Sequence, residues 1–263
     1  MLLAIDVGNT QTAIGVFKDK DLLCHWRIST HAEKTSDEWA VTITSLLTVQ
    51  GVRFKEIKAA VISSVVPAAT RALEEMVSTT VALKPILIGP EAKINISLLY
   101  DDPREIGADR IVNAVAVYNL YGGPAIVVDF GTATTFDVIS EKGEYLGGAI
   151  APGIEISTDA LFEKAAKLSK VEFRKPARVV GKNTVESLQS GIIYGFAGQV
   201  DSMVERIIDE LKVSERDRVK VVATGGLAEL LVPVCKTITQ HDPLLTLKGL
   251  KILYDLNTLG KRT

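Results

Sequence analysis

The sequence lacks the features that would tie it to disulfide chemistry, export or a membrane. It has only two cysteines, Cys24 and Cys235, with no Cys-x-x-Cys spacing, which argues against a disulfide framework or a zinc site. The N-terminus has no basic segment ahead of its short apolar run, and no stretch reaches the ~18 consecutive apolar residues that cross a bilayer. We therefore expect a cytoplasmic protein.

A strong charge of either sign is also missing. The formal net charge of -2 gives no electrostatic reason to expect nucleic acid or an anionic membrane as partner. The motifs GxxxxGK[ST], GxGxxG, HExxH and GxSxG are absent, and the three histidines have no spacing typical of metal ligands. With 47% hydrophobic and 24% charged residues, the composition is that of a globular protein.

The sequence does contain an ordered series of predicted elements, and its 263 residues are enough for two domains of roughly 100–130 residues. In the first half, three apolar runs predict a meander of strands, and a capping box at Thr35–Glu38 predicts a helix to about Leu47. A buried strand, a helix beginning at Pro67 and another strand follow, at 58–66, 67–76 and 85–89.

The second half repeats this order. Strands are predicted at 125–130, 134–140, 143–150 and 219–226, with helices from Ile154, over 184–211 and after Gly226. We interpret both halves as the order βββαβαβ, which predicts a duplicated α/β fold with a cleft between its halves. We place the domains at residues 1–113 and 114–255, and a loose tail at 256–263.

Each half opens on an Asp-x-Gly turn between its first two strands. In Asp6-Val-Gly-Asn-Thr10, Gly8 lets the backbone approach a ligand closely, and the four following residues offer donors to phosphate oxygens. The Asp6 carboxylate can hold a cation, directly or through water. A short turn of this kind also occurs in ordinary hairpins.

The second turn, Asp129-Phe-Gly-Thr-Ala-Thr-Thr135, has the same construction with more hydroxyl groups. Two such turns at matching places in a repeat favour a pair of phosphate-binding hairpins over two unrelated turns. Val221-Val-Ala-Thr-Gly-Gly226 is a strand ending in a glycine pair, which suits either the adenosine of a nucleotide or a tight strand-to-helix connection. The glycine-rich Gly147–Gly153 likewise admits a ligand or close packing.

Gly107-Ala-Asp-Arg110 precedes an apolar stretch that reads as a helix, so Asp109 and Arg110 are expected at its N-terminus. The arginine could clamp a carboxylate, and the aspartate could take a proton from a substrate hydroxyl. The alternative is a helix-capping aspartate beside a surface ion pair.

With DVGNT, GADR, DFGTATT, GGAIAPG and VATGG in this order over nearly its whole length, the chain resembles the type III pantothenate kinases. The resemblance implies an actin-like ATPase fold of the RNase H-like type, related to the acetate and sugar kinases. It also implies ATP-dependent phosphorylation of pantothenate, the first step towards coenzyme A, by a homodimer with sites at the subunit interface. The implied cofactors are ATP with Mg²⁺ and a monovalent cation, K⁺ or NH₄⁺.

The resemblance also assigns residues. It implies Asp109 as the general base and Asp129 as the ligand of the monovalent cation. The implied ATP-binding residues are Asp6, Val7, Gly8, Asn9, Thr10, Gln11, Thr12, Ala13 and Thr132. The implied pantothenate-binding residues are Tyr100, Gly107, Ala108, Asp109, Arg110 and Thr184.

Three other functions stay open at this point. A sugar or acetate kinase would keep both hairpins without GADR. A non-catalytic relative, such as a transcription accessory factor, could keep the fold without turnover. A hydrolase of polyphosphate or nucleotides would need catalytic acids and no carboxylate clamp.

Overall fold

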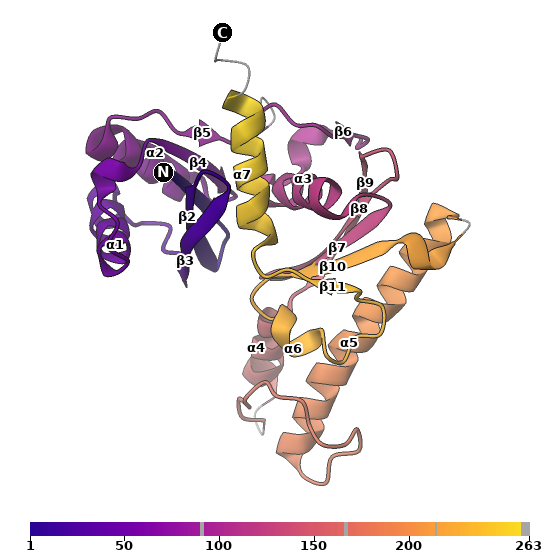
Figure 1. The fold of residues 1–263 in the computed structure, drawn as a ribbon. Helices are drawn as coiled ribbons and strands as arrows, with labels where there is room; N and C mark the ends of the chain where they lie inside the picture. The colour runs from indigo at the N-terminus through magenta and orange to yellow at the C-terminus, as the bar shows by residue number, and fades with distance from the viewer. Residues whose placement is uncertain (90–91, 166–167, 214, 259–263) are drawn as a thin grey trace. The chain divides into compact units, whose positions relative to one another are not determined.

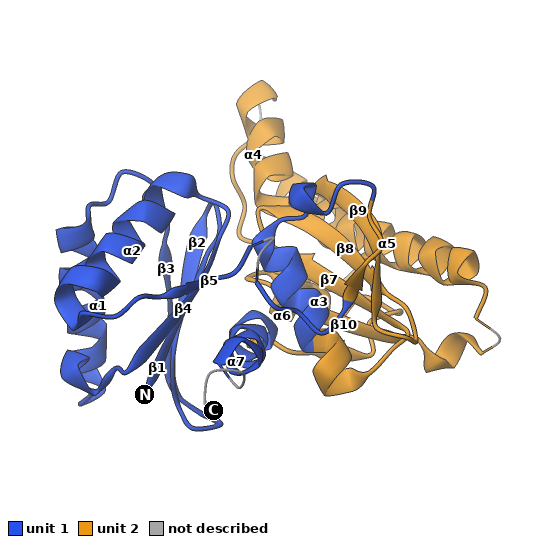
Figure 2. Ribbon diagram, turned by 90° about the horizontal axis from the view of Figure 1, so that it is seen from above, with its two compact units in different colours: residues 1–96, 101–116, 245–263 blue, residues 97–100, 117–244 orange. Residues whose placement is uncertain are grey.

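The computed structural model describes residues 1–89, 92–165, 168–213 and 215–258 (Figure 1). The chain forms two compact units, which Figure 2 distinguishes by colour. Unit 1 comprises residues 1–96, 101–116 and 245–263, and unit 2 comprises residues 97–100 and 117–244. No helix in the described part of the chain combines the length and apolar character that a membrane crossing requires.

Unit 1 is built on a five-stranded sheet with the order β3-β2-β1-β4-β5. Its strands are β1 (Leu2–Val7), β2 (Gln11–Lys18), β3 (Asp21–Ser29), β4 (Ala59–Ser64) and β5 (Ile86–Leu87). The first three form the predicted antiparallel meander, and β4 and β5 run parallel to β1. Nearly every residue of β1 is buried, because helices cover both faces of the sheet at its centre.

The helices of unit 1 are α1 (Ser36–Val49), α2 (Pro67–Val81), α7 (Leu245–Thr258) and the first part of α3 (Ala108–Tyr121). The predicted capping box is confirmed: Thr35 Oγ1 accepts from Glu38 N, and Glu38 Oε2 accepts from Thr35 N. Helices α1 and α2 pack on one face of the sheet, and α7 lies on the other (Figure 2). Short 3₁₀ turns occupy Phe54–Glu56 and Pro103–Glu105.

The close packing of α7 depends on two glycines. A Cβ at Gly15 of β2 would lie 3.1 Å from Leu247 of α7, and one at Gly249 would lie 2.5 Å from the carbonyl oxygen of Val112 in α3. Leu256–Thr258, which the sequence analysis places in the tail, form the last turn of α7. Asn257 ties this turn to Lys93 through two hydrogen bonds of 2.9 Å, and residues 259–263 lie outside the described residues.

Unit 2 contains a six-stranded sheet with the order β11-β10-β7-β8-β9-β6. Its strands are β6 (Ser97–Leu98), β7 (Ala125–Phe130), β8 (Ala133–Ile139), β9 (Glu144–Pro152), β10 (Lys220–Thr224) and β11 (Gln240–His241). Its helices are α4 (Ile154–Lys164), α5 (Thr184–Leu211), α6 (Ala228–Leu231) and the end of α3, with a 3₁₀ turn at Arg216–Arg218. Helices α4, α5 and α6 share one hydrophobic core with β7, β8 and β10.

The two sheets confirm the predicted duplication. The order β3-β2-β1-β4-β5 of unit 1 recurs as β9-β8-β7-β10-β11 in unit 2, with β6 added at the edge. Asp6 and Asp129 occupy equivalent places, each near the end of a central strand with an antiparallel neighbour on one side and a parallel one on the other. The predicted domain boundaries and the cleft between the halves stay predictions.

Candidate active site

The β1–β2 hairpin presents the first Asp-x-Gly motif at the carboxyl end of β1. Gly8 N donates to Gln11 O at 3.0 Å, which closes the turn. Asn9, Thr10 and Gln11 are exposed, so their polar groups are accessible to a ligand. Thr12 is fully buried and its hydroxyl lies 2.8 Å from that of Thr30, so this side chain braces the base of the hairpin.

The end of β4 is part of the same region, and the sequence analysis missed it. Ser63 lies beside Asp6 in the parallel register and is fully buried. Its hydroxyl has no hydrogen-bond partner within the described ranges. Two serines ending a buried parallel strand were the available signal, because ligands of α/β proteins bind at the carboxyl ends of such strands.

The Gly107–Arg110 segment begins α3, as the sequence predicts, with Ala108 as the first helical residue. Asp109 lies in the first turn, and its Oδ1 accepts a hydrogen bond of 2.8 Å from Arg110 N. A Cβ at Gly107 would lie only 2.5 Å from that oxygen, so glycine is needed for the carboxylate to hold this position. Arg110 is buried, with 8% of its surface exposed.

Burial raises the pKa of the Asp109 carboxyl above its ordinary value of 3.8. The hydrogen bond from Arg110 N and the positive charge of Arg110 oppose this effect and are weaker than it. A carboxylate with a raised pKa is a better proton acceptor than an ordinary one, provided that the pH keeps it ionised.

A short chain of contacts joins this segment to the first hairpin within unit 1. Val65 N donates to Val7 O at 3.0 Å. The side chain of Val65 lies 3.7 Å from the place where a Cβ of Gly107 would stand. The first hairpin and Asp109 therefore belong to one packed unit.

The β7–β8 hairpin of unit 2 is one residue tighter than the first. Gly131 N donates to Ala133 O at 3.1 Å, and Thr132 is half-buried at the tip. Asp129 lies between Thr135 on β8 and Thr224 on β10.

Two glycines approach this second hairpin closely. A Cβ at Gly225, where φ is +95°, would lie 2.5 Å from Asp129 Oδ1 and 2.6 Å from backbone atoms of Phe130. A Cβ at Gly153 would lie 2.2 Å from Thr132 O. The glycine-rich segments ending at Gly153 and Gly226 therefore pack their backbone closely against Thr132 and Asp129, respectively.

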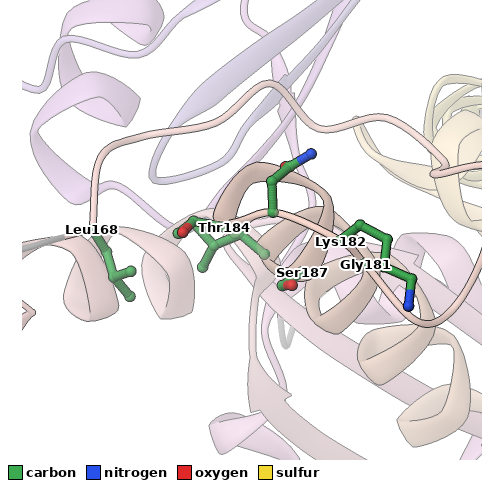
Figure 3. Close-up of a pocket in the computed structure, with 7 residues that line it drawn as sticks. Leu168, Gly181, Lys182, Thr184 and Ser187 are labelled. Atoms are coloured by element: carbon green, nitrogen blue, oxygen red, sulfur yellow. The ribbon is translucent and has the colours of Figure 1, made fainter.

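Tyr100 and Thr184 belong to unit 2 as well. Tyr100 follows β6 and has 36% of its surface exposed. Thr184 is the exposed first residue of α5, after Asn183, whose side chain accepts from Glu186 N at 2.9 Å. Thr184 lines an open pocket of about 570 Å³ together with Leu168, Gly181, Lys182, Asn183, Ser187 and Leu188 (Figure 3).

The candidate site residues are thus divided between the units. Unit 1 holds the Asp6 hairpin and the Gly107–Arg110 segment, and unit 2 holds the Asp129 hairpin, Tyr100 and Thr184. Comparison with known proteins adds the decisive observation. Residues 2–206 match the sequence model of the type III pantothenate kinases. The chain belongs to this family.

Curated relatives support this membership over the full length. A type III pantothenate kinase from Moorella thermoacetica is 55% identical over 258 residues, covering 98% of this chain and all of the relative. One from Halalkalibacterium halodurans is 51% identical over 257 residues, with the same coverage.

Solved structures show that this chain has the actin-like ATPase fold. An activator of 2-hydroxyisocaproyl-CoA dehydratase from Clostridium difficile, solved with ADPNP, superimposes with a TM-score of 0.59 at 14% identity, covering 100% of this chain and 97% of that one. A protein from Campylobacter jejuni described as a Baf family transcriptional activator also gives 0.59, at 21% identity, with coverage of 98% and 99%. At these identities the likeness concerns the fold alone.

Proposed function

We propose that this chain transfers the γ-phosphoryl group of ATP to the primary hydroxyl of pantothenate, forming 4′-phosphopantothenate, the first step of coenzyme A biosynthesis. The observation that carries the proposal is the half-buried Asp109 beside Arg110 at the start of α3, in a chain 55% identical over nearly its whole length to a type III pantothenate kinase. Pantothenate has one carboxylate and one primary hydroxyl, and these two side chains match that pair of groups.

Asp109 acts as the general base in this proposal and Arg110 binds the pantothenate carboxylate. The raised pKa of Asp109 brings its basicity closer to what proton removal from an alcohol requires. A guanidinium fork binds a carboxylate through two parallel hydrogen bonds. Tyr100, Gly107, Ala108 and Thr184 complete the pantothenate site, with the subunit partner of the proposed homodimer contributing to it.

The two hairpins bind the nucleotide. The exposed tip Asn9–Gln11 offers donors to phosphate oxygens, and Thr132 faces ATP from the second hairpin. Asp6, at the carboxyl end of β1 beside the buried Ser63, would hold the Mg²⁺ of ATP, directly or through water. When bound, this cation neutralises charge on the transferring phosphoryl group.

The Gly153→Ala substitution tests the role of the second hairpin. Gly153 has ordinary backbone angles, φ -70° and ψ 166°, so the added methyl acts by its collision with the backbone of Gly131 and Thr132 at the tip of the hairpin. We expect the KM for ATP to rise by about tenfold or more and stability to fall by about 1–3 kcal/mol. Steady-state kinetics and thermal unfolding measure both.

A matched control is Gly195→Ala in α5, where the added methyl has nothing within 4 Å. It should leave the KM for ATP unchanged and raise stability by about 0.5–1 kcal/mol, because alanine favours a helix. A KM for ATP that moves equally in both variants would contradict the role of Thr132.

The surroundings of Asp129 suit a monovalent cation. The described residues contain no cluster of three or more His, Cys, Asp or Glu side chains that could hold a metal, so a cation here would depend on one carboxylate with hydroxyl and carbonyl oxygens. Asp129 has threonines beside it on both strands, and the backbone at Gly225 comes very close to it. Oxygen donors of this kind suit hard cations.

Potassium dependence is the expected consequence. Pantothenate-dependent ADP release should rise with K⁺ or NH₄⁺ at constant ionic strength and stay flat with Na⁺. The Asp129→Asn variant should lose most of this activation because it removes the only charge that the proposal assigns to the cation. Equal rates in K⁺ and Na⁺ would remove the proposed role of Asp129.

A homodimer is supported by exposed apolar side chains on unit 2. They lie on β9, on α4 and just before α5: Ile150, Ile156, Leu161, Val179 and Val180. Exposed apolar groups of this kind mark interaction surfaces when they gather.

A cytoplasmic location stays a prediction of the sequence.

The experiment that tests the function is ADP release with pantothenate compared with a panel of sugars and with acetate. We expect release with pantothenate alone, and phosphate transfer to its primary hydroxyl by mass spectrometry. Release with a sugar or acetate and none with pantothenate would favour the other actin-like kinases. No turnover with any acceptor would favour a non-catalytic relative.

A further inference from the structure

A buried polar pair lies in the unit 2 sheet, and no step proposed above uses it. Asp137 on β8 and Tyr145 on β9 are both fully buried. Tyr145 Oη donates to Asp137 Oδ1 at 2.8 Å, and Thr135 Oγ1 lies 3.5 Å from Asp137 Oδ2. The strand register places Thr135 and Asp137 on the same face of the sheet as Asp129.

Tyr145 connects this pair to Tyr100. The two rings have centroids 6.2 Å apart and an interplanar angle of 51°, which is within the range of favourable tilted aromatic pairs. Leu99 N donates to Tyr145 O at 2.9 Å, so the backbone leading into Tyr100 is attached to the same residue.

Gly147 supports the Tyr100 ring from the adjoining backbone. Its φ of +102° is a conformation that residues with a side chain rarely adopt. A Cβ there would lie 3.4–3.5 Å from the Tyr100 ring carbons Cε2 and Cδ2. The ring therefore lies beside a stretch of β9 that carries no side chain, with Tyr145 next to it.

A gain in stability alone does not explain why this sheet buries a tyrosine hydroxyl and a carboxylate together. A phenylalanine at position 145 would fill the same space and would need no carboxylate on the neighbouring strand, and buried ionisable pairs often add little to stability. The hydrogen bond to Asp137 does, however, restrict the Tyr145 ring to one position. A fixed Tyr145 in turn restricts the ring that packs against it.

We infer that Asp137 and Tyr145 are positioning residues that hold Tyr100 in the orientation in which it contacts pantothenate. The inference rests on the proposed function, in which Tyr100 belongs to the pantothenate site. Binding sites depend on such support, because a small misplacement of a contact residue lowers affinity and rate.

Tyr145→Phe is the test, since it removes one hydroxyl and keeps the ring. The KM for pantothenate should rise about tenfold, with kcat within about twofold of wild type and the KM for ATP unchanged. A purely structural role would lower the melting temperature and leave the KM for pantothenate where it is.

Tyr121→Phe is the matched control. Tyr121 Oη donates to Asp242 Oδ2 at 2.9 Å, so it forms the same type of pair within the same unit, and the aspartate is again buried. This variant should lower the melting temperature without changing the KM for pantothenate. A rise in that KM equal to the one in Tyr145→Phe would overturn the inference.

Tyr100→Ala, alone and combined with Tyr145→Phe, separates the inference from the proposed function. We expect Tyr100→Ala to raise the KM for pantothenate, and Tyr145→Phe to add nothing further in that background. If Tyr100→Ala has no effect on KM, the proposed role of Tyr100 fails. If it has one, the positioning role is overturned by either of two results: Tyr145→Phe alone leaves the KM of the otherwise wild-type enzyme unchanged, or it raises the KM of the Tyr100→Ala enzyme by its full factor.

Asp137→Ala provides the same test should Tyr145→Phe fail to fold. It removes the oxygen that accepts from Tyr145 Oη and keeps both tyrosine rings. The KM for pantothenate should rise, and an unchanged KM in a folded Asp137→Ala enzyme would also overturn the inference.

Discussion

Asp109→Asn is expected to lower kcat by about 10²–10⁴-fold, with the KM for ATP within about twofold of wild type. The amide is the same size as the carboxyl but cannot accept the proton of the pantothenate hydroxyl. It can still accept the hydrogen bond from Arg110 N, which the carboxylate Oδ1 accepts at 2.8 Å in the wild type. Initial rates at saturating substrates measure the change, and wild-type turnover in this variant would remove Asp109 from the chemistry.

The pH dependence follows from the same carboxyl group. Because burial raises its pKa above 3.8, the wild-type rate should fall on the acid side as pH drops through that raised pKa. The contribution of this carboxyl group to the free energy of unfolding changes with pH in the opposite direction. The protonated form is favoured in the folded state, so this contribution is complete below the ordinary pKa and is lost as pH rises through the raised one.

Asp109→Asn removes the titrating carboxyl group, so the stability of this variant serves as the folding control. Its melting temperature at neutral pH should equal or exceed that of wild type, and any gain should disappear at pH values below 3.8. A large loss of melting temperature at neutral pH would mean that the loss of rate cannot be assigned to proton transfer.

Arg110→Ala is expected to raise the KM for pantothenate by about 10–150-fold, the equivalent of about 1.5–3 kcal/mol for hydrogen bonds to a charged group. Arg110→Lys should give an intermediate value, because an ammonium keeps the charge and lacks the two-pronged geometry. Arg104→Ala is the control, since Arg104 lies six residues upstream in an exposed ion pair with Asp102 and should leave that KM unchanged.

A substrate analogue makes the assignment of Arg110 specific. If its guanidinium binds the pantothenate carboxylate, an analogue with a neutral amide there should bind less tightly than pantothenate to wild type. Arg110→Ala should no longer distinguish the two compounds. A variant that keeps the full wild-type preference would place the carboxylate elsewhere.

Local sequence signals were sufficient for most of the secondary structure. Thr35 and Glu38 formed the capping box that their spacing predicts, and Pro67 begins α2. These features depend on neighbours within one helical turn, so the sequence contains all the information they need. The repeated order of elements was sufficient for the duplication, which the matching strand orders of the two sheets confirm.

Elements that depend on distant partners were harder to predict. Strands β6 and β11 have two residues each and exist through pairing with β9 and β10. The last turn of α7 was assigned to a tail because the tie between Asn257 and Lys93 joins residues far apart in the chain. Such contacts leave no local pattern of hydrophobicity or capping.

The sequence by itself determined the family and the duplicated fold, because its motifs are short, ordered and local. The role of Asp109 as the base stays a prediction. Only the tertiary structure decided how those residues are supported. It placed Ser63 beside Asp6, Val65 against Gly107, Gly153 and Gly225 against the second hairpin, and Tyr145 beside Tyr100. These are through-space contacts between segments that only the folded chain brings together, so spacing along the sequence cannot reveal them.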